Sequence, residues 1–143
     1  MPQKGAAVSR KPRISARERE SLLVLAKAAT MRSYSPYSRF KVGAAVLTEA
    51  GTIYCGCNVE NSSYGLTNCA ERTAIFAAVA TEGAKMRMRA IAVWSQPERP
   101  CSPCGACRQV ILEFGPDAIV LFQGRNGIEE VGASDLLPSG FLF

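Results

Sequence analysis

The stretch AIVLFQGRNGIEEVG, residues 118–132, decides how the last two strands pair and therefore which fold the chain adopts. The apolar run AIVLFQ is typical of a buried strand, and IEEVG follows as a second strand. Only GRNG separates the two, and Asn126-Gly127 favours a tight hairpin turn. A parallel return needs a crossover of about a dozen residues or more, so we expect these strands to run antiparallel.

The segments before this hairpin alternate between helix and strand patterns. Ser15 and Glu18 make a capping-box pair, and an apolar helical face follows as far as about Thr30. KVGAAVLTEAGTIYCGCN, residues 41–58, predicts two antiparallel strands around a turn that contains glycine. RAIAVW, residues 89–94, has the continuous apolar run of a buried strand.

Two further helices are each expected to begin near a cysteine. The first should run from about Cys69 to Glu82, and Gly83 should end it. The second opens within PCGACRQVILEF, residues 103–114, with Pro103 in the first turn, where its missing amide would have no helical partner. The resulting order, α-β-β-α-β-α-β-β, predicts a three-layer α/β/α domain with a five-stranded mixed sheet.

The composition indicates one domain with a real core. The chain has 143 residues, of which 48% are hydrophobic and 20% charged, as is ordinary for a globular protein. We expect a single domain over residues 15–143 and a flexible basic tail over residues 1–14. Four basic residues of the tail account for most of the net charge of +5; they are Lys4, Arg10, Lys11 and Arg13. The domain itself is near neutral, so we expect no nucleic-acid partner, with a nucleic-acid-binding arm as the alternative for the tail.

The sequence offers no membrane-spanning or secretory segment. TAIFAAVA, residues 73–80, is far shorter than the ~20 residues that cross a bilayer. Residues 1–15 lack the apolar centre of a secretory signal. We therefore expect a cytoplasmic protein without membrane contact. In that compartment, six cysteines are typical of metal or catalytic sites and not of a disulfide framework.

Three of the cysteines have the spacing of metal ligands. Cys104 and Cys107 should project from one side of a helix whose N-terminus favours their thiolates. A redox pair is the alternative for CGAC, but this motif does not follow the first strand of a thioredoxin-like unit. Cys69, which begins another helix, is the candidate third ligand. Three ligands and an open fourth position are typical of a catalytic zinc site.

Glu71 stands two residues after Cys69, in a chain that contains no histidine. Positions i and i+2 do not share a helical face, so Glu71 is badly placed to ligate the same zinc but can reach its open position. A carboxylate beside a zinc-bound water can carry protons. Without histidine, neither a Ser-His-Asp triad nor a Cys-His nucleophile can be built. We therefore expect Glu71 to be the catalytic residue.

These motifs resemble those of a known family. CAERTAI, residues 69–75, followed by PCGACRQVI, residues 103–111, is similar to the signature of the zinc nucleoside and nucleobase deaminases. The similarity to cytidine deaminases runs from about Tyr34 to Phe143 and includes PYSRFKVGAAV, GCNVEN and LLPSGF. The resemblance implies a cytidine-deaminase-like fold and one Zn²⁺ per subunit. It also implies hydrolytic deamination of cytidine and 2′-deoxycytidine to uridine and 2′-deoxyuridine, with release of ammonia, in pyrimidine salvage.

The resemblance also assigns roles to individual residues. Asn58 and Glu60 would hold the ribose, Phe40 would line the same pocket, and Ala70 would contact the substrate. The alternative for Asn58 and Glu60 is a structural role, in which the polar side chains at a strand end make hydrogen bonds within their own turn. The alternative for Phe40 is core packing.

Two further roles follow from the same resemblance. Arg72 would donate hydrogen bonds to the thiolates and so offset the net negative charge of a three-cysteine zinc site. Compact members of the family are homotetramers in which a C-terminal phenylalanine, here Phe141, stacks on the base bound by a neighbouring subunit.

Three other functions are alternatives to the deamination of a free nucleoside. Relatives that act on polynucleotides generally carry a helix between the last two strands, so the resemblance together with the short GRNG link disfavours an editing deaminase. The near-neutral domain also lacks the basic surface expected for strand binding. A deaminase of a nucleoside-like antibiotic is a second alternative within the same fold. A zinc-stabilised binding module would instead recruit Cys101 as a fourth ligand and leave Glu71 idle.

Overall fold

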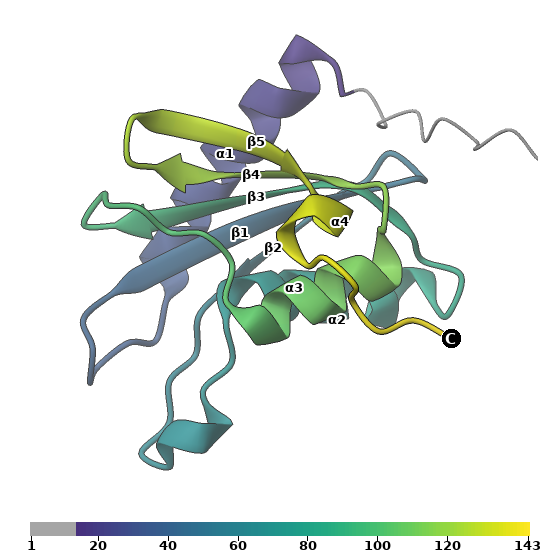
Figure 1. Ribbon diagram of the computed structural model, residues 1–143. Helices are drawn as coiled ribbons and strands as arrows, with labels where there is room; N and C mark the ends of the chain where they lie inside the picture. The colour runs from purple at the N-terminus through teal and green to yellow at the C-terminus, as the bar shows by residue number, and fades with distance from the viewer. Residues whose placement is uncertain (1–13) are drawn as a thin grey trace, which may run out of the picture.

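The computed structural model describes residues 14–143, in which a mixed sheet lies between two layers of helices (Figure 1). The sheet has five strands in the order β2-β1-β3-β4-β5. The strands are β1 (Lys41–Thr48), β2 (Ile53–Cys57), β3 (Met88–Gln96), β4 (Ile119–Gly124) and β5 (Gly127–Gly132). All neighbouring strands pair antiparallel except β3 and β4, which are parallel. The expected three-layer fold and the antiparallel last strand are therefore confirmed.

Helices cover both faces of this sheet. They are α1 (Ala16–Ala29), α2 (Ala70–Glu82), α3 (Gly105–Phe114) and the short α4 (Ala133–Leu136), with 3-10 turns η1 (Thr30–Arg32) and η2 (Tyr64–Leu66). Figure 1 shows α1 on one face and α2 with α3 on the other. In β1, Val46 belongs to the core cluster under α2, and Leu47 belongs to the cluster under α1. Successive side chains of a strand point to opposite faces, so β1 is buried on both sides.

Two glycines allow the helices to approach the sheet closely. A Cβ atom on Gly43 would lie 2.1 Å from the carbonyl oxygen of Ala26 in α1. A Cβ atom on Gly56 would lie 2.4 Å from the backbone nitrogen of Ala74 in α2. Only glycine permits such contacts, because any side chain would push the helix away. The glycine in β2 thus helps to set how close α2, which begins at the candidate site, lies to the sheet.

The local signals in the sequence are confirmed at several element ends. Ser15 and Glu18 form the expected capping box: the Glu18 amide donates to Ser15 Oγ at 3.0 Å, and the Ser15 amide donates to Glu18 Oε1 at 2.9 Å. Gly83 follows α2 with a φ of +86°, a conformation that favours glycine. The β4–β5 hairpin closes with Gly124 opposite Gly127.

Other expectations need correction. Pro103 does not stand in the first turn of α3, because the N-cap of that helix is Cys104, whose backbone is extended. Pro103 therefore precedes the helix. The short helix α4 was not predicted from the sequence, because its four residues are too few to show an apolar periodicity.

Two expectations concern the ends and surroundings of the chain. The basic tail predicted for residues 1–14 falls, apart from Ile14, outside the described residues. Within the part of the chain that the structure describes, no helix is both long and apolar enough to cross a membrane.

Candidate metal and substrate site

The three predicted metal ligands come together at the N-termini of two helices. Cys69 is the N-cap of α2, Cys104 is the N-cap of α3, and Cys107 lies in the first turn of α3. Their sulfur atoms all lie within 4.8 Å of one another. Cys107 is buried, whereas Cys69 and Cys104 are more accessible. Three converging sulfurs with one open side fit a tetrahedral zinc ion that keeps a fourth position for a small molecule.

Hydrogen bonds favour a thiolate at this cluster. Cys69 Sγ lies 3.8 Å from Cys104 Sγ and accepts a hydrogen bond of 3.2 Å from Arg72 Nη2. Hydrogen bonding from Cys107, Arg72 and Cys104 together lowers the pKa of Cys69 to about 5. The same contact with Cys69 raises the pKa of Arg72 further above its usual value. The hydrogen bond with Cys69, together with burial, raises the pKa of Cys107, so the thiolate is favoured at Cys69. Thiolates are the form of cysteine that binds zinc, so Cys69 is prepared for a metal by its neighbours.

Glu71 lies beside this cluster in the first turn of α2 and is only 4% exposed. Burial raises the pKa of its carboxyl group from 4.5 to about 7, and the charge of Cys69 adds to the effect. Glu71 is not a member of the sulfur cluster. A carboxyl group that changes its protonation near neutral pH is suited to accept a proton and release it again.

A cavity of about 250 Å³ opens onto Glu71 and two of the clustered cysteines, Cys69 and Cys104. Most of the residues that sequence analysis singled out line it together, namely Phe40, Asn58, Glu60, Cys69, Ala70, Glu71 and Cys104. The remaining lining residues are Ser38, Val42, Thr67, Cys101 and Ser102. The cavity therefore joins the candidate metal ligands to the polar end of β2, although the two regions are distant in the sequence.

Asn58 and Glu60 are held in place by groups of residues 33–42, a stretch that ends inside β1. Asn58 Oδ1 accepts from the Val42 amide at 2.9 Å and from the Ser33 hydroxyl, and its Nδ2 donates to the Phe40 carbonyl at 2.8 Å. One amide face of Asn58 is thus used in tying β2 to β1. These hydrogen bonds join Asn58 to β1 and to the segment before it and not to its own turn, while Nδ2 still carries a second hydrogen beside the cavity.

Glu60 Oε1 accepts from the amides of Tyr37 and Ser38 at 2.9 and 3.2 Å. Hydrogen bonds from Ser38 and then Tyr37 lower the pKa of Glu60, so the carboxylate stays charged at the cavity. A fixed carboxylate is a strong acceptor for hydroxyl groups of a ligand.

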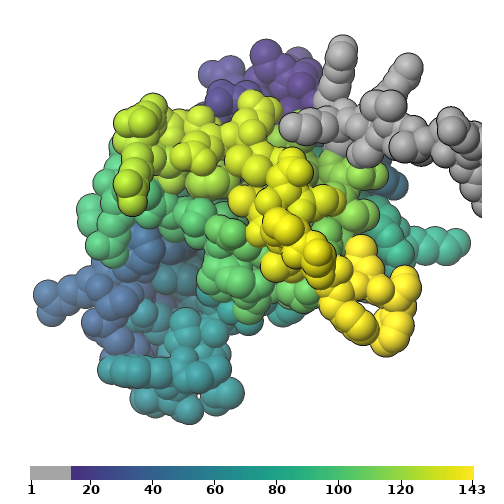
Figure 2. Space-filling model, in the orientation of Figure 1, coloured from purple at the N-terminus to yellow at the C-terminus, as the bar shows by residue number. Residues whose placement is uncertain are grey.

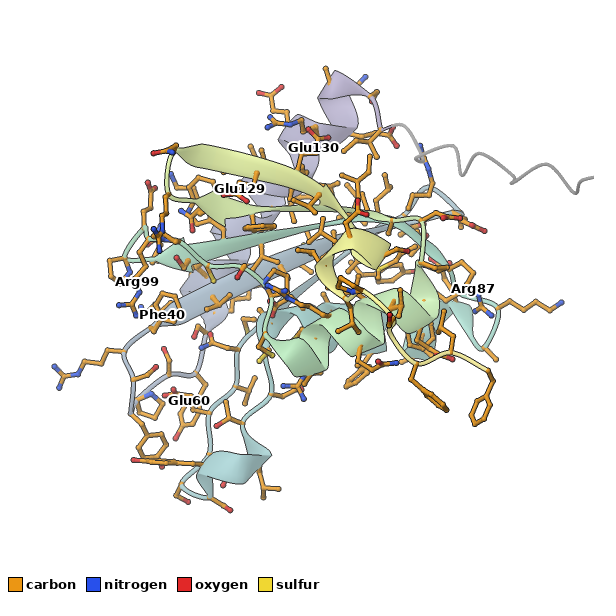
Figure 3. All side chains as sticks on the ribbon, viewed as in Figure 1. Phe40, Glu60, Arg87, Arg99, Glu129 and Glu130 are labelled. Atoms are coloured by element: carbon orange, nitrogen blue, oxygen red, sulfur yellow. The ribbon has the colours of Figure 1, made fainter. Side chains whose placement is uncertain are left out.

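The ring of Phe40 stacks with the guanidinium group of Arg99. The guanidinium carbon of Arg99 lies 3.9 Å from the centroid of the Phe40 ring, and Figure 3 shows the two side chains together on the same side of the view as Glu60. The stacking restrains Phe40 at the cavity wall. No pattern in the sequence pointed to Arg99, because it reaches Phe40 only through the folded loop between β3 and α3.

Phe141 stands apart from the cavity of its own chain. Its side chain is 67% exposed and contacts the ring of Phe143 edge to face, with the centroids 5.0 Å apart. Its carbonyl accepts from Gln109 Nε2 at 2.8 Å. Figures 1 and 2 show the C-terminal segment as a projection beside α3. A role for Phe141 in substrate binding therefore requires a second copy of the chain.

Cys101 lines the cavity but does not belong to the sulfur cluster. Burial raises the pKa of its thiol to about 11, so it stays protonated at neutral pH. Its position outside the sulfur cluster disfavours a closed site with four cysteine ligands. Cys57 lies on β2, away from the cluster, and donates to the Arg32 carbonyl at 3.4 Å.

The chain is similar in sequence to proteins named cytidine deaminase. The family profile described as the cytidine and deoxycytidylate deaminase zinc-binding region matches residues 16–123. A protein named cytidine deaminase from Sporosarcina psychrophila is 52% identical over 124 residues, which cover 85% of this chain and 90% of the relative. Another of that name, from Halalkalibacterium halodurans, is 48% identical and covers 87% of this chain and 94% of the relative.

Solved structures agree with these sequence matches. The crystal structure of cytidine deaminase from Burkholderia pseudomallei has a TM-score of 0.76 and 47% identity, covering 90% of this chain and 100% of that one. The crystal structure of cytidine deaminase from Mycobacterium tuberculosis has a TM-score of 0.77 and 40% identity, covering 88% and 98%. The chain therefore matches these proteins over nearly their full length.

Proposed function

The chain belongs to the cytidine and deoxycytidylate deaminase family, and from this premise we propose that it is a zinc-dependent hydrolase that deaminates cytidine and 2′-deoxycytidine. The products are uridine and 2′-deoxyuridine, with ammonia. One observation carries the proposal: Glu71, buried and with a pKa of about 7, shares a cavity with two of three clustered cysteines. A site that only stabilised the fold would have no use for a buried titratable carboxyl group there.

In the proposed site, Cys69, Cys104 and Cys107 hold one zinc ion. Bound zinc lowers the pKa of a coordinated water and so supplies the nucleophile at neutral pH. Arg72 donates to the Cys69 sulfur and draws electron density from it, which limits the negative charge that three thiolates bring to the site. The side chain of Arg72 is thus a tuning group and does not contact the substrate.

Glu71 moves the protons of the reaction. Its carboxylate takes a proton from the attacking water and gives it to ring nitrogen 3 of the cytosine. It then carries a second proton, from the hydroxyl group added at carbon 4, to the exocyclic amine, so that ammonia leaves and a carbonyl forms at carbon 4. A pKa of about 7 leaves both protonation states populated near neutral pH, as a group that both accepts and donates requires.

The other end of the cavity binds the sugar. The charged Glu60 and the remaining amide hydrogen of Asn58 offer an acceptor and a donor for ribose hydroxyls. Phe40 and the backbone at Ala70 form the walls between the sugar and the reacting ring. A free nucleoside, and not a polynucleotide, is the proposed substrate, because β5 runs antiparallel to β4 and only a short turn joins them.

The proposal extends to assembly and cellular role. We propose a homotetramer in which Phe141 of one subunit stacks on the base held by the next, since this aromatic ring is exposed in a single chain. Pyrimidine salvage and a cytoplasmic location stay predictions.

Conversion of cytidine to uridine tests the function directly. Zinc-loaded protein is mixed with cytidine, and the loss of absorbance near the cytosine maximum is followed. Glu71→Ala is the matched control, which should keep zinc and fold while losing about 10²- to 10⁴-fold in turnover. Zinc binding without conversion would identify a zinc-stabilised module instead, and an Ala variant with turnover close to that of the wild type would exclude Glu71 as the proton carrier.

A further inference from the structure

Arg108 connects three segments around the start of α3. Its Nε donates to the Pro103 carbonyl at 2.8 Å, and its Nη1 donates to the Leu136 carbonyl at 3.0 Å. A longer contact of 3.4 Å joins Nη2 to Ser102 Oγ. Two of these partners lie in the loop before α3, and the third belongs to α4. One side chain thus ties the loop that carries Cys104 to the C-terminal part of the fold.

The Pro103 carbonyl is the group next to Cys104, the N-cap of α3. Side chains on a helix lean toward its N-terminus, so Arg108 folds back over the first turn to reach this carbonyl. The Pro103 ring is fully buried, and the ring fixes its φ. With its ring packed and its carbonyl held, residue 103 has little freedom to rotate. The peptide plane that leads into Cys104 is restrained as a consequence, and with it the position of the Cys104 backbone.

Arg108 differs from Arg72 in what it contacts. Arg72 donates to a sulfur of the cluster, whereas Arg108 donates to two carbonyls and a hydroxyl. Two of these groups belong to the loop that carries Cys104, so the contacts link Arg108 to the metal site through that loop and not through a sulfur. The neighbouring residue Gln109 holds the Phe141 carbonyl, so the same turn of α3 also anchors the C-terminal segment.

We propose that Arg108 is a positioning residue of the zinc site, which fixes the ligand Cys104 through the Pro103 carbonyl and joins the ligand loop to α4. The inference rests on the proposed zinc ligands but not on the proposed reaction. Outer partners that orient metal ligands are typically worth about 10- to 100-fold in metal affinity. Removal of Arg108 should consequently speed the loss of zinc.

The test compares zinc release from three variants of the zinc-loaded full-length chain. Arg108→Ala removes all three contacts, and Arg108→Lys keeps the charge but loses the fork of donors. Arg87→Ala is the matched control, because Arg87 also donates to two carbonyls, those of Met86 and Ala84, at 2.7 and 3.3 Å. Figure 3 shows Arg87 on the opposite side of the view from Phe40 and Glu60. An excess of a chromogenic chelator reports the release rate, and thermal unfolding of the metal-free chains reports general damage.

We expect Arg108→Ala to release zinc at least about tenfold faster than the wild type, with Arg108→Lys between them and Arg87→Ala unchanged. Release at the wild-type rate in both Arg108 variants overturns the inference, as does equally fast release from Arg87→Ala. If Arg108→Ala does not fold, Arg108→Lys decides alone. A wild-type chain that binds no zinc overturns the proposed function as well, whereas a zinc-binding chain indifferent to Arg108 overturns only this inference.

Discussion

Replacement of Glu71 by glutamine should stabilise the metal-free protein at neutral pH while it abolishes turnover. Burial, reinforced by the charge of Cys69, raises the pKa of Glu71 from 4.5 to about 7. Between these pH values the native state binds a proton that the unfolded chain has released. Stability therefore falls as the pH rises from 4.5 to about 7. Glutamine does not ionise, so the variant escapes this loss.

The size of the effect follows from the shift in pKa. One pKa unit corresponds to ~1.4 kcal/mol, so the shift from 4.5 to about 7 destabilises the native state by ~3 kcal/mol above neutral pH. Because Glu71 is only 4% exposed, solvent screens this penalty little. For a domain of this size the penalty is worth about 10 °C in Tm. Glu71→Gln should recover much of it near pH 8 and little near pH 4, where both states hold the proton.

Thermal unfolding of chelator-treated protein, followed by circular dichroism at both pH values, measures the gain. Glu113→Gln removes an exposed carboxylate from α3 and serves as the control. It should show no comparable gain at either pH. The same gain at both pH values for Glu71→Gln, or none near pH 8, would refute the reasoning, because neither result can arise from a buried carboxyl group whose pKa is raised.

Cys104→Ser should lower the zinc content, whereas Cys101→Ser should leave it intact, because Cys101 lies outside the sulfur cluster; metal analysis decides between these outcomes. Phe141→Ala should keep its zinc but raise the Michaelis constant through the loss of stacking worth ~1 to 3 kcal/mol. Mixtures of Phe141→Ala and Glu71→Ala chains should be more active than either parent, and a monomer by light scattering would contradict shared sites. Ser15→Ala should lower the free energy of unfolding, measured by urea denaturation, by about 1 kcal/mol, because α1 loses its N-cap. An unchanged urea midpoint would show that the cap does not stabilise the fold.

The parts of the fold that sequence predicted well are those decided by a few adjacent residues. Asn126-Gly127 allows a tight turn whatever surrounds it, and the capping box of Ser15 and Glu18 is complete within one helical turn. The cysteine spacing belongs to the same class, because a pair three residues apart at a helix start converges by helix geometry alone. Such local chemistry is readable without the rest of the chain.

Features that depend on distant segments were missed. Arg108 reaches Leu136 only because α4 packs beside α3, and Arg99 reaches Phe40 only because the loop after β3 folds over the cavity. The position of Pro103 was assigned wrongly for a related reason. Proline is tolerated both in a first turn and just before a helix, and only the extended backbone of Cys104 shows which applies. The sequence carried these residues but no local signal of their partners.

The metal-free fold carries several features that lower its stability, and they converge on one place. Cys69 and Cys104 occupy N-cap positions without a capping hydrogen bond from the side chain, whereas Ser15 caps α1. An N-cap that lacks an oxygen acceptor costs about 1 kcal/mol. Glu71 adds its own penalty beside them. Zinc binds the folded arrangement of the three sulfurs more tightly than the unfolded chain, so the difference in binding free energy offsets these costs by mass action. A lower stability without the metal, restored when it binds, is thus the expected consequence of placing the proposed proton carrier and the sulfur ligands at two helix starts.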